Sequence, residues 1–86
     1  MELVLYTSAF CAPCVRARSV LKDAGALLPR ARIREVDVLS NLLESEARRI
    51  ESTPTLVVRR NGTEVFRAAG VPSVQQVLAA AALALD

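Results

Sequence analysis

Residues 3–14 read LVLYTSAFCAPC, and this stretch decides the fold. Its first part, residues 3–7, is a short apolar run rich in strand-forming residues, which predicts a buried strand. A helix is predicted from residue 13 to about residue 24, because proline is well tolerated in the first turn of a helix. The two cysteines therefore lie where a strand passes into a helix, with Cys11 in the turn and Cys14 one turn into the helix.

The rest of the chain divides at its proline and glycine residues. We predict a strand at 33–38, a helix at 41–50, strands at 55–59 and 64–68, and a helix at 73–85. Asn61-Gly62 joins the last two strands, and Asn-Gly is the strongest short-range signal for a hairpin because both residues tolerate positive φ. Ser73 with Gln76 predicts a capping box at the start of the last helix.

This order of elements, β-α-β-α-β-β-α, predicts an α/β fold with a mixed four-stranded sheet and three helices. A strand, helix and strand in succession require a right-handed parallel crossover, and the closing hairpin adds an antiparallel edge. The length of 86 residues predicts one domain spanning residues 1–86.

Three details of the helices are also predicted. Gly25 is expected to cap the end of the first helix, and Asn41 with Glu44 is expected to form a capping box for the second. The second helix should bury an apolar stripe, made of Leu42, Leu43, Ala47 and Ile50.

Composition excludes several classes of function. The chain has no histidine, so a Ser-His-Asp or Cys-His catalytic unit is impossible. Its net charge is only +2 and its arginines are scattered, which argues against nucleic-acid binding. The acidic second residue is not typical of a signal peptide, and the longest apolar run, residues 77–85, is too short to span a bilayer. We therefore expect a cytoplasmic protein that does not bind membranes.

Paired cysteines in a reducing compartment indicate redox or metal chemistry. The N-terminus of a helix favours a thiolate through its unpaired N–H groups and partial positive charge. Cys11, exposed at the turn, is predicted to attack a substrate disulfide, and Cys14, on the buried face of the helix, to resolve the mixed disulfide. Arg16 and Arg18 could add positive potential, although both are interpreted as solvated helix residues.

Three other interpretations of the cysteines compete with this one. A structural zinc site needs four ligands, and one copy of this chain offers two cysteines and no histidine. A static disulfide would close only a very small loop in a compartment that disfavours it. Two cysteines placed in the core without redox function remain an alternative.

The sequence resembles the thioredoxin-like superfamily over nearly its whole length. Residues 6–14, YTSAFCAPC, are similar to the thioredoxin active-site segment, with Phe10 in place of the usual tryptophan. Residues 52–58, STPTLVV, followed by Asn61-Gly62, are similar to the second thioredoxin signature. Ala69-Gly70 matches the glycine that follows the last strand. In size the chain is similar to glutaredoxins.

The resemblance implies a protein-disulfide reductase that works through Cys11 and Cys14. It implies a cis Thr53-Pro54 bond facing the cysteines, with the Thr53 backbone available to a substrate strand. The expected substrate-docking surface consists of Phe10, Ala12, Pro13, Thr53, Pro54 and Gly70. The expected partners are disulfide-containing proteins and, as electron donor, a thioredoxin reductase-like flavoprotein or a low-molecular-weight thiol. We expect the protein to be a monomer. We expect it to bind no metal and to need no cofactor apart from its redox-active disulfide.

The chain departs from thioredoxins at two positions that handle protons. Leu5 stands where thioredoxins carry a buried aspartate beside the resolving thiol, and Ile33 is the counterpart of their nearby lysine. Glu35 and Asp37 are candidates for the missing group by strand position alone, and each is interpreted as a solvated charge.

Other functions remain open from the sequence. One is a glutaredoxin-like oxidoreductase using a low-molecular-weight thiol, although the C-P-Y-C pattern and the glutathione-binding residues of that family are absent. Another is a dimer holding a metal or an iron–sulfur cluster between two C-x-x-C loops. The last alternative function is a binding module with the same fold and no redox activity.

Overall fold

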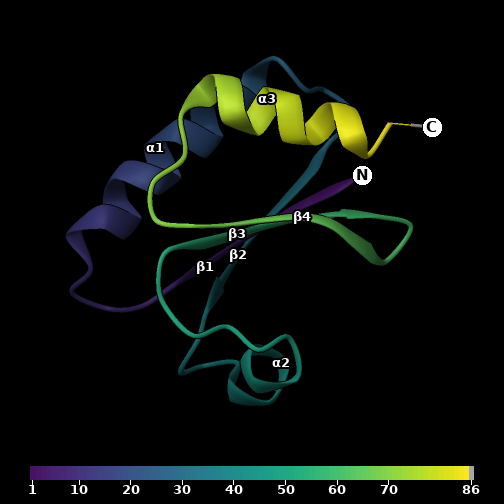
Figure 1. Ribbon diagram of the computed structural model, residues 1–86. Helices are drawn as coiled ribbons and strands as arrows, with labels where there is room; N and C mark the ends of the chain where they lie inside the picture. Colours follow the sequence, from purple (N-terminus) through teal and green to yellow (C-terminus); the bar gives the residue numbers. More distant parts are fainter. Residues whose placement is uncertain (86) are drawn as a thin grey trace.

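The computed structural model describes residues 1–85 (Figure 1). Seven elements follow one another along the chain: β1 (Glu2–Thr7), α1 (Ala12–Ala26), β2 (Arg32–Asp37), α2 (Leu42–Ala47), β3 (Thr55–Arg60), β4 (Thr63–Ala69) and α3 (Val74–Leu83). This is the predicted order β-α-β-α-β-β-α. None of the described helices is both long and apolar enough to cross a membrane.

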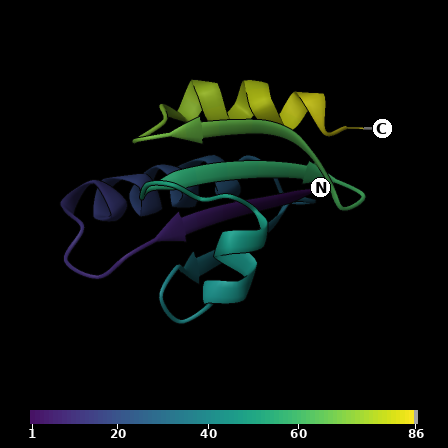
Figure 2. The ribbon, with the colours of Figure 1, turned by 60° about the horizontal axis from the view of Figure 1, so that its bottom comes forward.

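The four strands form one mixed sheet in the order β2-β1-β3-β4. β1 pairs in parallel with β2, and β3 pairs antiparallel with both β1 and β4. Figures 1 and 2 show α1 and α3 on one face of this sheet and α2 on the other. The predicted α/β class, with a mixed four-stranded sheet and three helices, is confirmed.

The main core lies between the sheet and the pair of helices α1 and α3. Alternate residues of β1 and β3 point into it, and so do residues at helical spacing on α1 and α3. Its fully buried members are Leu3, Leu5, Ala17, Leu21, Ala24, Leu56, Val58, Val77, Ala80 and Ala84. This layer matters for the site because it holds α1, which carries both cysteines, against β1.

The opposite face of the sheet has a smaller core and a network of charged groups. Val4, Tyr6, Val36 and Val57 are buried there. The phenol of Tyr6 donates a hydrogen bond to Glu44 Oε2 at 2.9 Å and accepts one from Arg59 Nη2 at 2.8 Å. Burial, followed by the neighbouring Glu44 carboxylate, raises the pKa of Tyr6, so the phenol stays protonated and can donate.

Two predictions about helix ends are wrong. α1 runs through Gly25 to Ala26, and its C-cap is Leu27. Gly25 lies against β2, where a Cβ would come within 2.5 Å of Cδ1 at the end of the Ile33 side chain. Asn41 is the N-cap of α2 but makes no side-chain capping bond. The reason is competition at both positions: the side-chain amide of Asn41 donates to the carbonyl oxygen of Asp37 at 3.0 Å, and Glu44 binds Arg34 and Tyr6.

The predicted apolar stripe on the second helix is also wrong. α2 has only six residues, so it ends at Ala47 and leaves Ile50 in the following segment. Leu42 and Leu43 are exposed, at 52% and 85%. α2 is instead attached to the sheet through Glu44, which binds Tyr6 of β1 and Arg34 of β2.

The capping box at the start of α3 is confirmed. The side chain of Ser73 accepts a hydrogen bond from the N–H of Gln76, and the side chain of Gln76 accepts one from the N–H of Ser73. The helix ends at Leu83, so Leu85 is exposed and Ala84 takes its place in the core.

Replacement of Tyr6 by phenylalanine should lower the free energy of unfolding by about 2 kcal/mol, because it removes a hydrogen-bond acceptor from a buried guanidinium. Arg59 is only 5% exposed, and its Nε already lacks a hydrogen-bond partner among the described residues. Urea unfolding of Tyr6→Phe measures the loss. Glu44→Gln is the matched control, since it keeps an acceptor for the phenol. If Tyr6→Phe lowered the free energy of unfolding no more than Glu44→Gln does, the role of the Tyr6 hydroxyl as an acceptor for Arg59 would be contradicted.

Candidate active site

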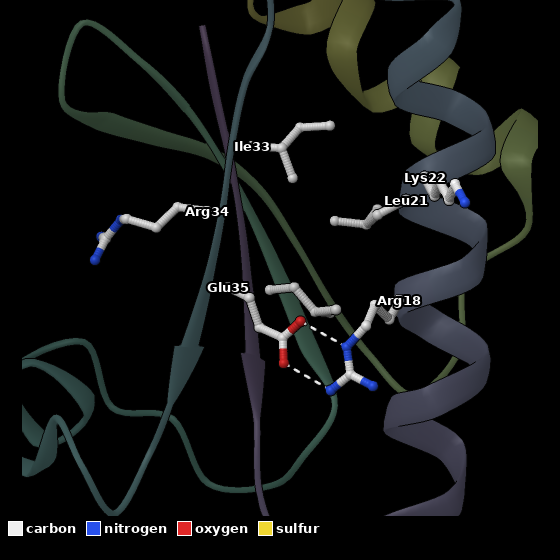
Figure 3. Close-up of a pocket in the computed structure, with 7 residues that line it drawn as sticks. Arg18, Leu21, Lys22, Ile33, Arg34 and Glu35 are labelled. Atoms are coloured by element: carbon white, nitrogen blue, oxygen red, sulfur yellow. Dashed lines mark hydrogen bonds and ion pairs between the residues drawn. The ribbon is translucent and has the colours of Figure 1, made fainter.

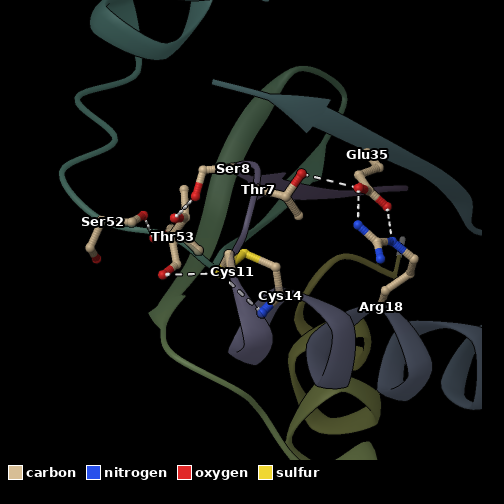
Figure 4. The surroundings of a disulfide bond; sticks show 9 residues. Thr7, Ser8, Cys11, Cys14, Arg18, Glu35, Ser52 and Thr53 are labelled. Carbon is tan, nitrogen blue, oxygen red and sulfur yellow. Dashed lines mark hydrogen bonds and ion pairs between the residues drawn. A yellow bond between two sulfur atoms is a disulfide. The ribbon is translucent and has the colours of Figure 1, made fainter. Parts of the chain in front are cut away.

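Cys11 and Cys14 form a disulfide at the junction of β1 and α1, with their Cα atoms 5.2 Å apart (Figure 4). Cys11 is the N-cap of α1, and Pro13 lies in the first turn of that helix. The backbone N–H of Cys14 donates to both Sγ and the carbonyl oxygen of Cys11, each at 3.1 Å. One N–H group of the first turn, that of Cys14, is therefore directed at the sulfur of Cys11.

The two sulfurs differ in their access to solvent. Cys14 is 1% exposed and faces the sheet, whereas Cys11 is partly exposed. The cause is helical geometry, because Cys14 shares the buried face of α1 with Ala17 and Leu21, while Cys11 precedes the helix. The arrangement can present one sulfur to an incoming disulfide and keep the second behind it.

A second segment, between α2 and β3, approaches the disulfide from the other side. The Thr53-Pro54 peptide bond is cis, as the resemblance implied. Cys11 Sγ lies 4.0 Å from the carbonyl oxygen of Thr53. The Gly70 N–H donates to the carbonyl oxygen of Pro54 at 2.9 Å, which holds Gly70 beside this segment. Gly70 has φ of 88°, a conformation that favours glycine.

Ser8 also belongs to this contact, and the sequence did not single it out. Its hydroxyl shares a hydrogen bond of 2.6 Å with the hydroxyl of Thr53. Figure 4 shows the two side chains directed at each other beside the disulfide. This bond ties the end of β1 to the Thr53-Pro54 segment. Serine after a strand usually marks only a turn, so no sequence signal could have identified it.

The remaining residues of the expected docking surface flank Cys11 in the chain. Phe10 is fully exposed and has φ of 54°, which is uncommon for a residue other than glycine. Ala12 is exposed and Pro13 is partly exposed. The structure thus brings Phe10, Ala12 and Pro13 to the same end of the sheet as Thr53, Pro54 and Gly70. Their role in binding stays a prediction.

The position of the missing aspartate is occupied by a buried leucine. Leu5 is 1% exposed and belongs to the main core. On the neighbouring strand, its register partner is Glu35. Both Glu35 and Arg18 are exposed, as interpreted from the sequence, and they bind each other through two hydrogen bonds of 2.7 Å (Figure 3). The Arg18 guanidinium holds the pKa of Glu35 below its ordinary value.

Asp37, the other candidate, has a local structural role. Its Oδ1 accepts hydrogen bonds from the N–H groups of Leu39 and Ser40, each at 3.0 Å. It therefore shapes the turn after β2. Among residues 1–85 no group of three or more histidine, cysteine or acidic side chains is placed to hold a metal ion.

Comparison with known proteins identifies thioredoxins as relatives of this chain. The family model for thioredoxin matches residues 1–82. A thioredoxin from Chlamydia trachomatis is 33% identical over 71 residues, which is 83% of this chain and 70% of that protein. A thioredoxin from Chlamydia pneumoniae is 30% identical over the same shares.

Solved structures agree with the sequence comparisons. Desulfothioredoxin from Desulfovibrio vulgaris Hildenborough superimposes with a TM-score of 0.84 at 26% identity, covering 94% of this chain and 78% of that one. Thioredoxin from Fasciola hepatica gives 0.84 at 21% identity over the same shares, which bears on the fold alone.

A disulfide between a strand and a helix N-terminus, on this fold, defines a thioredoxin-type thiol–disulfide oxidoreductase. The chain belongs to the thioredoxin family.

Replacement of Cys14 by serine should trap a mixed disulfide between Cys11 and a small aromatic disulfide, because the resolving thiol is gone and Cys11 is accessible. Intact-mass measurement under non-reducing conditions would show the adduct. Cys11→Ser is the matched control and should remain unmodified in the folded state, since Cys14 is buried. Equal modification of the two variants would contradict the assigned order of attack.

Proposed function

We propose that this protein reduces disulfide bonds in other proteins. The observation that carries the proposal is the difference between the sulfurs: Cys11 is partly exposed at a helix N-terminus, and Cys14 is buried one turn behind it. The family supports it too, since thioredoxins generally reduce disulfide-containing protein substrates. In thiol–disulfide exchange the thiolate is the attacking species, so the site that favours a thiolate acts first.

The reaction proceeds in two exchanges. In the reduced protein the Cys11 thiolate attacks one substrate sulfur, forming a mixed disulfide and releasing the other sulfur as a thiolate, which takes up a proton. Cys14 then loses its proton to water and attacks Cys11 Sγ. The Cys11–Cys14 bond forms, the bond to the substrate breaks, and the second substrate sulfur leaves with the electron pair and is protonated. Two electrons pass from the dithiol to the substrate.

Substrate binding uses the surface around Cys11. Phe10, Ala12, Pro13, Thr53 and Gly70 form an uncharged surface at this end of the sheet, whereas Pro54, the remaining residue of the expected docking surface, is fully buried. An extended substrate segment can pair with the backbone of Thr53, whose carbonyl oxygen lies 4.0 Å from Cys11 Sγ. Such a surface suits many unfolded or extended chains, because backbone pairing does not depend on the substrate sequence.

The electron donor proposed for this chain is a thioredoxin reductase-like flavoprotein, which is the typical donor of the family. We place the protein in the cytoplasm as a monomer that needs no cofactor beyond its disulfide. A glutaredoxin-like function and a dimer that shares a metal are not favoured, since every comparison described above leads to thioredoxins.

An insulin-reduction assay with dithiothreitol as electron donor tests the proposed function. The wild-type protein should accelerate precipitation of the insulin B chain well above the dithiothreitol background. Cys11→Ser should fall to that background, because it retains only the buried thiol. Indistinguishable rates for the two proteins would overturn the proposal.

The reduction potential of the Cys11–Cys14 pair distinguishes a reductase from an oxidase. We expect a value near that of thioredoxin, about −270 mV, because the proline before Cys14 is the one found in reducing members of the fold. Equilibration with glutathione buffers, read by mass spectrometry after alkylation, measures it. A potential near about −120 mV would instead indicate a protein that introduces disulfides.

A further inference from the structure

The backbone of Thr53 is the part of the site with which an extended substrate would pair. Among residues 1–85, neither its N–H nor its carbonyl oxygen has a backbone hydrogen-bond partner. The carbonyl oxygen lies 4.0 Å from Cys11 Sγ. A substrate strand needs Thr53 and Cys11 at a fixed distance from each other, because one binds its backbone and the other attacks its disulfide.

The residues on either side of Thr53 are held through their carbonyl oxygens. That of Ser52 accepts a hydrogen bond from Thr55 Oγ1 at 2.7 Å. That of Pro54 accepts one from the N–H of Gly70 at 2.9 Å. Within the described part of the chain Thr53 has no such bond, and it belongs to neither a helix nor a strand. Its position therefore depends on its side chain.

The side chain of Thr53 is tied to Ser8. The two hydroxyl oxygens are 2.6 Å apart, and Figure 4 shows the side chains directed at each other. Ser8 directly follows β1, whose last residue, Thr7, is buried. The carbonyl oxygen of Thr7 accepts a hydrogen bond from the N–H of Val38 at 2.9 Å. Ser8 thus extends from a strand end that packing and hydrogen bonding both hold in place.

Ser8 is also linked to the attacking cysteine, because Cys11 follows it closely in the chain. The turn from Ser8 to Cys11, the approach of Cys11 Sγ to the Thr53 carbonyl oxygen and the Ser8–Thr53 hydrogen bond form one closed circuit (Figure 4). The hydroxyl contact is the shorter of the two links between the segments. It therefore determines how far the Thr53 backbone lies from the sulfur.

We propose that Ser8 is a positioning residue for protein substrates. Its hydroxyl holds Thr53 so that a substrate strand paired with the Thr53 backbone presents its disulfide to Cys11 Sγ. The Cys11 thiolate then forms a bond to one substrate sulfur, the substrate disulfide breaks, and the other substrate sulfur leaves as a thiolate and takes up a proton. The inference rests on the proposed function and deepens it, since it concerns how the same site selects its substrates.

A small disulfide without a peptide backbone has nothing to pair with Thr53. It needs only access to Cys11, which is partly exposed. The Ser8–Thr53 bond should therefore favour the reduction of protein disulfides over that of small disulfides. A hydrogen bond between two neutral groups changes an equilibrium about five-fold, and we expect a preference of that size.

Reaction of the reduced protein with two disulfides tests the proposal. Insulin is the protein substrate, and oxidation of the cysteine pair is followed by rapid alkylation and mass spectrometry. Dithiobis(nitrobenzoate) is the small substrate, and the released aromatic thiolate is followed by absorbance. Ser8→Ala should slow the second-order reaction with insulin about five-fold and leave the reaction with dithiobis(nitrobenzoate) at the wild-type rate. An unchanged rate with insulin would overturn the proposal, and so would an equal loss with both substrates.

Two further serine variants are the controls. Ser8→Thr keeps the hydroxyl and should react with insulin at nearly the wild-type rate. If it were as slow as Ser8→Ala, the hydroxyl would not be responsible and the proposal would fail. Ser19→Ala makes the same substitution at an exposed serine of α1 and should change neither rate. A loss equal to that of Ser8→Ala would contradict a role specific to Ser8.

Thr53→Val examines the same hydrogen bond from its other end. The substitution removes the partner hydroxyl and keeps the backbone and the approximate shape of the side chain. Alone, it should slow the insulin reaction by about the same factor as Ser8→Ala. Together, the two substitutions should slow it no more than either does alone, because both remove one bond. Losses that multiply would show that Ser8 does not act through Thr53.

The wild-type protein separates this inference from the proposed function. If it reacts with dithiobis(nitrobenzoate) but does not reduce insulin, the proposed function fails, and the inference that rests on it fails too. If it reduces insulin and Ser8→Ala does so equally fast, only the role of Ser8 is contradicted.

Discussion

The packing of α1 against β1 is the constraint on which the site depends. Leu3 and Leu5 on the strand interlock with Ala17 and Leu21 on the helix, and this contact fixes where the first turn of α1 lies. That turn carries both cysteines, so their different exposure follows from the packing. Burial of these four side chains contributes several kcal/mol, at roughly 25 cal/mol per Å².

Two contacts from distant parts of the chain complete the site around that turn. The Thr53-Pro54 segment is held to the end of β1 by the Ser8–Thr53 hydrogen bond and to the segment after β4 by Gly70. On the other side, Glu35 reaches Thr7 from β2. Cys14 is buried, and the Thr53-Pro54 segment lies beside the partly exposed Cys11.

Much of this could be predicted from the sequence, because the signals were local. The alternation of elements, the Asn61-Gly62 turn and the Ser73–Gln76 capping box each involve residues close together in the chain. The errors fell where a distant partner competes with a local one. Glu44 binds Arg34 and Tyr6 and does not cap α2, and Gly25 accommodates Ile33 from β2 and does not end α1. Local patterns contain no information about such partners.

The sequence by itself predicted a thiol–disulfide oxidoreductase of the thioredoxin type, since the C-A-P-C pair at a strand–helix junction is a contiguous signal. It also showed that Leu5 removes the usual carboxylate. Only the tertiary structure decided which polar groups of neighbouring strands meet at this end of the sheet. Thr7 and Glu35 are 28 residues apart in the chain, and the parallel pairing of β1 with β2 brings them together. Register and helix packing are long-range properties, which is why the contacts of Glu35 with Thr7 and Arg18 could not be predicted from the sequence.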